Sequence, residues 1–66
     1  MNRIERFIKD NNLDFSGEGS DLNGNCVVLA GYALYANIDY LELLRYFNDA
    51  ETQTCTEGAI RELGRV

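Results

Sequence analysis

The chain has 66 residues, a net charge of −5 and 45% hydrophobic residues, with no histidine and no proline. This hydrophobic content excludes a disordered chain, and the acidic balance argues against nucleic acid as the main partner. At this length we expect a single domain, residues 1–66, with a thin core. Self-association as a homodimer would enlarge that core, and we keep it as an open alternative.

Residues 2–12 are predicted to form the first helix. Asp10, Asn11 and Asn12 are suited to end it. The apolar residues of this segment recur at helical spacing and would share one face: Met1, Ile4, Phe7 and Ile8. The basic residues would share the outer face: Arg3, Arg6 and Lys9.

Residues 14–25, DFSGEGSDLNGN, are predicted to form the longest loop, because three glycines permit tight turns. We expect Phe15 and Leu22 to anchor this loop to the core. The segment also matches the first half of a calcium-binding EF-hand loop, but its twelfth position, normally a bidentate glutamate, is Asn25. We therefore predict no metal site. The loop is the most acidic part of the chain, and three of its carboxylates are predicted to bind a partner: Asp14, Glu18 and Asp21.

Residues 25–37, NCVVLAGYALYAN, are the long apolar stretch of the chain and are predicted to form a central helix that is buried on all sides. Asn23 or Asn25 would cap its start, and Asn37 would end it in the left-handed conformation. The stretch is too short to cross a membrane, which takes about 20 apolar residues. Its small residues form a narrow seam: Cys26, Ala30 and Ala33. The alternative is an α+β fold with a short hairpin within residues 13–35, since valine and tyrosine favour strands.

Residues 39–49 are predicted to form a third helix that starts at Asp39, with Glu42 completing a capping box. The short connection before it predicts an antiparallel hairpin with the central helix. The apolar residues would face inward: Tyr40, Leu41, Leu43, Leu44 and Phe47. The residues on the opposite face are predicted to bind a partner: Glu42, Arg45 and Tyr46.

A fourth helix is predicted from Thr54, which with Glu57 forms a second capping box, to Leu63, with Gly64 as its end. Glu57 and Arg61 would form an exposed ion pair one turn apart. Gly58 should cost this helix about 1 kcal/mol relative to alanine. The inward residues would be four: Cys55, Ala59, Ile60 and Leu63.

The residue types argue against an enzyme and against a cofactor. Histidine, the commonest acid–base group and metal ligand, is absent, and two cysteines far apart give no zinc pattern. Over six residues, 21–26 (DLNGNC), the chain resembles the nucleophile segment of papain-like and ovarian-tumour-type cysteine hydrolases. Those enzymes need a general base, commonly histidine, so we predict no catalysis through Cys26. Cys26 and Cys55 are predicted to be reduced core thiols in the cytoplasm.

The sequence is best interpreted as a non-catalytic protein-binding module, an acidic inhibitor or adaptor. Its size and charge are those of small phage proteins that inhibit host enzymes or defence systems, including anti-CRISPR proteins. One version is a DNA mimic that offers its carboxylates to a basic nucleic-acid-binding protein. The alternative is a DNA-binding or transcription-regulatory protein, because the last two helices resemble a helix-turn-helix. Two features oppose this alternative: the predicted connection is longer than the usual three or four residues, and acidic residues oppose approach to phosphate.

Overall fold

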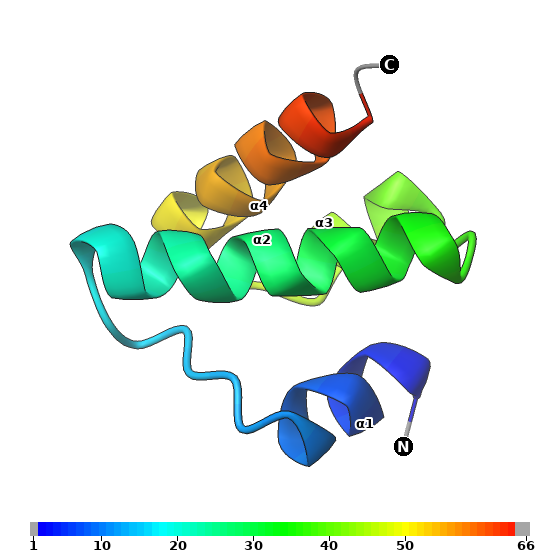
Figure 1. Cartoon of the computed structure of the whole chain (residues 1–66), viewed down its shortest axis with the longest axis horizontal. Coiled ribbons are helices and arrows are strands. Elements are labelled where there is room, and N and C mark those ends of the chain that lie inside the picture. Colours follow the sequence, from blue (N-terminus) through cyan, green and yellow to red (C-terminus); the bar gives the residue numbers. More distant parts are fainter. Residues whose placement is uncertain (1, 65–66) are drawn as a thin grey trace.

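A computed structural model describes residues 2–64 and shows four helices with no strand among these residues (Figure 1). The helices are α1 (Arg3–Asp10), α2 (Gly19–Tyr35), α3 (Tyr40–Arg45) and α4 (Ala50–Leu63). The predicted all-α fold is confirmed. The alternative hairpin within residues 13–35 is wrong, because a single continuous helix occupies most of that segment. None of the four helices has the length and the apolar run needed to cross a membrane.

Asparagine ends both α1 and α2, as the sequence predicts. Asn12 and Asn37 have φ angles of 54° and 55°, the left-handed conformation that asparagine tolerates better than most residues. The next residues donate their backbone N–H groups back into the helices, Leu13 to the Ile8 carbonyl at 3.0 Å and Ile38 to the Ala33 carbonyl at 2.9 Å. These bonds form the Schellman motif, which turns an apolar side chain back onto the core just after each helix.

Helix α2 begins at Gly19, six residues before the predicted start at residue 25. Asn23 and Asn25 therefore lie inside the helix and do not cap it, and Glu18 at the N-cap makes no side-chain capping bond. The early start has a clear cause. From residue 22 the chain already carries the stripe that faces the rest of the molecule: Leu22, Cys26, Leu29, Ala30 and Ala33. Burial of this stripe favours the helix over the loop that the glycines suggested.

Asn25 instead fastens the preceding loop to α2, since its Nδ2 group donates to the Asp14 carbonyl at 2.7 Å. The loop itself is shorter than predicted and spans residues 11–18. Phe15 within it is half-buried and its ring lies 5.0 Å from the ring of Phe47. The prediction that Phe15 anchors this loop is confirmed, whereas Leu22 belongs to α2.

The starts of α3 and α4 are set by aspartates. Asp39 accepts the Leu41 N–H at 2.8 Å, as predicted, but α3 ends at Arg45 instead of residue 49. Helix α4 begins at Ala50 and not at Thr54, because Asp49 accepts both the N–H and the hydroxyl of Thr52, at 3.1 and 2.9 Å. The aspartate bonds hold the pKa of Asp49 below its ordinary value. The capping box predicted at Thr54 is wrong, since a stronger cap lies five residues earlier.

The core consists of two adjoining clusters, both built on α2. Phe7 of α1 stacks on Tyr32 of α2, with ring centroids 4.1 Å apart and nearly parallel. Phe15 and Ile60 pack against both clusters. The first cluster joins α1, α2 and α3: Ile4, Leu29, Ala33, Ile38, Leu43 and Phe47. The second joins α2 and α4: Leu22, Cys26, Ala30 and Ala59.

Helix α4, and not α3, is the main packing partner of α2. The two helices run in the same direction, since Cys55 contacts Asn23 near their starts and Leu63 lies beside Gly31 near their ends. The predicted antiparallel hairpin of α2 with α3 is therefore wrong as the principal contact. In Figure 1, α2 crosses the middle of the molecule with α1 on one side and α4 on the other. Small residues on both helices permit this close approach.

The prediction that the central helix is buried on all sides is also wrong. Two sides of α2 are covered and the rest faces solvent, so Tyr35 is 88% exposed. Met1, assigned to the apolar face of α1, lies outside the described residues. Val27, Val28 and Leu34, on the uncovered side of α2, are exposed for the same reason, and three apolar residues of the other helices are also exposed: Tyr40 and Leu41 of α3 and Leu63 of α4.

Three glycines in the helices give a first test of these boundaries. A Cβ added at Gly24 or Gly58 would meet nothing within 4 Å, so Gly24→Ala and Gly58→Ala should each raise the free energy of unfolding by about 0.5–1 kcal/mol. Gly19 also has open space, but its φ of 62° disfavours a side chain, and Gly19→Ala should lower stability by about 1–2 kcal/mol. Urea unfolding followed by circular dichroism measures all three. A stabilising Gly19→Ala would show that residue 19 does not adopt this left-handed backbone conformation.

Candidate functional site

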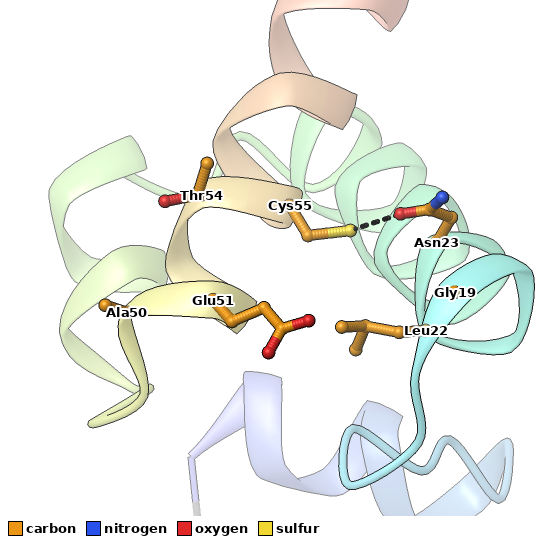
Figure 2. Close-up of a pocket in the computed structure, with 7 residues that line it drawn as sticks. All are labelled: Gly19, Leu22, Asn23, Ala50, Glu51, Thr54 and Cys55. Carbon is orange, nitrogen blue, oxygen red and sulfur yellow. Dashed lines mark hydrogen bonds between the residues drawn. The ribbon is translucent and has the colours of Figure 1, made fainter.

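An open groove of about 550 Å³ lies between the first turns of α2 and α4 (Figure 2). It continues into a second hollow of about 490 Å³ that follows the two helices to Leu63. Three residues line both parts: Asn23, Thr54 and Cys55. The groove exists because two parallel helices, whose starts lie about thirty residues apart in the sequence, begin side by side.

The groove has an apolar floor, one polar contact across it and one carboxylate. Leu22 is 4% exposed and forms the floor. The Cys55 thiol donates to the Asn23 carbonyl oxygen Oδ1 at 2.9 Å and so joins α4 to α2. Figure 2 shows the Glu51 carboxylate reaching from α4 toward Leu22. Leucine and glutamate together make a surface that is apolar at its base and negative at its edge.

Further carboxylates surround this end of the molecule. Glu18 and Asp21 are neighbours in sequence of the lining residues Gly19 and Leu22, and Asp49 directly precedes the lining residue Ala50. Acidic side chains at a helix start are favoured by the helix dipole, which explains their presence there in structural terms. Two helix starts converge at the groove, and the local negative charge is therefore concentrated.

Most of the acidic residues have no basic partner. The sequence holds eleven carboxylate side chains, all within residues 2–64. The ion pair found among these residues joins Arg61 to Glu57 at 2.7 Å, as predicted, which leaves ten carboxylates without one. The exposed bases Arg3, Arg6 and Lys9 lie on α1, on the opposite side of α2 from α4 (Figure 1). The first part of the groove is thus surrounded by negative charge, whereas the bases of α1 lie on the other side of α2 and Arg61 lines the second hollow.

The six residues predicted to bind a partner are all exposed and fall into two groups. The first group follows the loop and the start of α2: Asp14, Glu18 and Asp21. The second lies on and just after α3: Glu42, Arg45 and Tyr46. An aromatic row links the groups, since Phe47 contacts Phe15 of the loop and also the ring of Tyr46, at 5.0 and 5.2 Å. Their role in binding stays a prediction.

Among these six, Asp14 has the most defined surroundings. It accepts hydrogen bonds from the N–H and the hydroxyl of Ser16, at 2.9 and 2.6 Å, and these bonds lower its pKa. The carboxylate is therefore firmly ionised and held in place at the surface.

Sequence reasoning missed the residues that build the groove. The predicted helices 39–49 and 54–63 leave Glu51 in the connection between them, Asn23 is predicted as a helix cap, and Cys55 is predicted to lie in the core. The signal that could have found Glu51 is the aspartate cap at Asp49, which puts Glu51 in the first turn of a helix. No comparable local signal indicates that Asn23 and Cys55 meet.

The helix-turn-helix alternative gains one feature from the structure. Helices α3 and α4 are separated by residues 46–49, a four-residue connection, so the predicted longer connection is wrong. The charge argument against DNA is unchanged, because α4 carries Glu51, Glu57 and Glu62 against Arg61. Arg65, a further base of the C-terminal segment, lies outside the described residues.

The described residues contain no group of three or more cysteine, aspartate or glutamate side chains placed to hold a metal ion. Comparisons with protein-family models, with curated proteins and with solved structures found no match for this chain.

Proposed function

We propose that this chain is a non-catalytic protein-binding domain, an inhibitor or adaptor that binds a basic surface of another protein. The observation that carries the proposal is the groove at the starts of α2 and α4, with its apolar floor at Leu22 and the free carboxylate of Glu51 above it. Among residues 2–64 Glu51 has no ion-pair partner, so its carboxylate is available to a partner's lysine or arginine.

The groove suits a long basic side chain for a physical reason. Lysine and arginine bury their hydrocarbon stems on apolar surface while the charged end remains at a polar edge. Leu22 would contact the stem and Glu51 the charged group. Asp21, which directly precedes the lining residue Leu22 on α2, would attract the charged group from a longer distance.

The wider charge distribution supports a nucleic-acid-binding protein as the partner. Such proteins present rows of lysine and arginine that normally meet phosphates. Within residues 2–64, ten carboxylates form no ion pair, and they offer the same kind of negative surface. A DNA-mimicking inhibitor, such as a phage protein directed against a host or defence-system enzyme, is the version of this proposal that we favour.

A pair of matched variants tests the groove. Asp21→Asn with Glu51→Gln removes two negative charges beside it, and Glu5→Gln with Asp10→Asn removes the same charge from α1 on the other side of α2. Each form is used as bait in a bacterial lysate, at low and high salt, and captured proteins are quantified by mass spectrometry. The groove pair should reduce capture of a basic protein at least about tenfold, a loss of about 1.4 kcal/mol of binding, while the α1 pair retains it.

Salt and nuclease distinguish the remaining alternatives. Capture that rests on charge should fall steeply with salt, since exposed charges are screened beyond about 10 Å at 0.1 M. Equal losses for the two pairs would contradict the groove as the site. Capture that disappears after nuclease treatment would favour direct DNA binding, and capture of the chain alone would favour a homodimer, to which the exposed Val28, Tyr35 and Leu41 are suited.

A further inference from the structure

The two cysteines lie on facing turns of α2 and α4. Cys26 is fully buried, Cys55 is half-buried, and both are free thiols. The Cys55 thiol contacts Asn23, one turn before Cys26 on α2, at 2.9 Å. Thr56, the neighbour of Cys55 on α4, donates its hydroxyl to the Cys26 sulfur at 3.6 Å. These two contacts place the sulfurs on either side of one narrow helix–helix gap.

The two thiols differ in their access to solvent. Cys55 lines the groove, and Figure 2 shows its sulfur directed across the groove toward α2. Cys26 lies beneath, in the cluster with Leu22, Ala30 and Ala59, and Cys55 packs against that cluster. A reagent that enters the groove therefore meets Cys55 first and reaches Cys26 only through Cys55.

The surroundings also keep Cys26 protonated. Burial, together with the adjacent Cys55 thiol, raises the pKa of Cys26 to about 11. The thiolate is the reactive form of cysteine, so at neutral pH Cys26 is a poor first nucleophile. The position of Cys26 suits it instead to attack the sulfur of Cys55 after Cys55 has reacted.

We propose that Cys55 is a thiol–disulfide exchange site for a small disulfide of the glutathione type, with Cys26 as the resolving thiol. In the first step, Cys55 loses its proton and its thiolate attacks one sulfur of the oxidised glutathione. The glutathione disulfide bond breaks, a mixed disulfide forms on Cys55, and one glutathione leaves and takes up a proton. The groove volume of about 550 Å³ gives room for the attached group.

In the second step, Cys26 loses its proton and attacks the Cys55 sulfur. The mixed disulfide breaks, the second glutathione leaves and is protonated, and a Cys26–Cys55 disulfide remains. Two protein thiols are oxidised and one glutathione disulfide is reduced to two thiols, so atoms and electrons balance. The product joins α2 to α4 beneath the groove. It also removes the Cys55 thiol hydrogen, and with it the hydrogen bond that Asn23 accepts. Small side chains at this contact, Ala30 and Ala59, permit the close approach of the two helices that a disulfide requires.

The test uses the full chain and oxidised glutathione, with intact-mass spectrometry under non-reducing conditions. We expect the wild type to pass through a single glutathione adduct to a monomer that has lost two hydrogens. Cys26→Ala should stop at the adduct, and Cys55→Ala should remain unmodified while folded. Circular dichroism confirms that each variant is folded, with Cys26→Ser as the replacement if Cys26→Ala is not. In guanidinium both single variants should react at similar rates, because the difference comes from the fold.

The pH dependence of the second step adds a distinct readout. Below the pKa of Cys26 the thiolate fraction rises tenfold per pH unit, so conversion of the adduct to the disulfide should accelerate about tenfold from pH 7 to pH 8. A wild-type adduct that never converts, a disulfide-linked dimer as the main product, or modification of Cys26 in folded Cys55→Ala would each overturn the proposal. None of these results bears on the carboxylate variants, so the two proposals can fail separately.

Discussion

Leu29→Ala should lower the free energy of unfolding by about 2–5 kcal/mol, measured by urea unfolding and circular dichroism. Leu29 is 0% exposed and lies in the cluster with Ile4, Leu43 and Phe47, where three helices meet. Replacing its isobutyl side chain with a methyl group loses buried apolar area and leaves a cavity that short, connected helices cannot fully close. A chain of this size has a total stability of about 3–10 kcal/mol, so the variant should be partly unfolded at room temperature.

The matched control is Leu34→Ala, the same substitution on the same helix. Leu34 is 43% exposed, beyond the region that α4 covers, and its replacement should change the unfolding free energy by less than about 1 kcal/mol. If the two variants lost equal stability, the division of α2 into covered and exposed sides would be wrong. If Leu29→Ala lost under 1 kcal/mol, the first core cluster would not hold the fold together.

Ala30→Leu should destabilise the protein by about 1–3 kcal/mol, because it adds volume where α2 and α4 are in direct contact. Ala30 is 0% exposed and packs with Cys26 and Ala59, all small residues. A leucine at this position must push α4 away from α2 and should also disturb the groove between them. The midpoint of thermal unfolding measures the loss, and a lower heat-capacity change would indicate a looser native state.

Ala50→Leu is the control for added volume. Ala50 is exposed at the first turn of α4, where a larger side chain can extend into solvent or over the groove. We expect little change in its melting temperature. A neutral Ala30→Leu would contradict the close packing of α2 against α4, and with it the approach of the two thiols.

The proposed function and the fold have a common physical origin at the groove. Two helix starts favour nearby carboxylates through their dipoles, and two helices that run in the same direction bring both starts to one end. The same arrangement therefore stabilises the helices and concentrates negative charge. A partner that brings lysine or arginine to this end would gain attraction without requiring either helix to move.

The sequence by itself determined the local features of this protein. Four helices, the aspartate cap at Asp39, the left-handed end at Asn37 and the Glu57–Arg61 pair all follow from side chains within a few residues of one another. The small-residue seam at Cys26 and Ala30 was also visible, since it depends only on helical spacing. The sequence did not indicate which helix packs against this seam.

The sequence did not predict the starts of α2 and α4, because different signals there favoured different boundaries. The glycines of residues 14–25 predicted a loop, and the box at Thr54 predicted a late start for α4. Burial of Leu22 extended α2 backward, and the Asp49 cap started α4 earlier. In both places a contact with a distant segment, or a stronger bond nearby, outweighed the local preference.

Only the tertiary structure decided which helix covers the seam, which apolar residues stay exposed and where the groove lies. Leu34 and Leu29 have the same chemistry, yet one is exposed and the other is buried, because α4 and the first core cluster cover only part of α2. Asn23 and Cys55 lie 32 residues apart and meet only after α4 packs beside α2. The hydrogen bonds that cap helices, and the periodicity of apolar residues, act over a few residues. Burial and contacts such as Asn23–Cys55 depend on the surfaces that come together only in the folded chain.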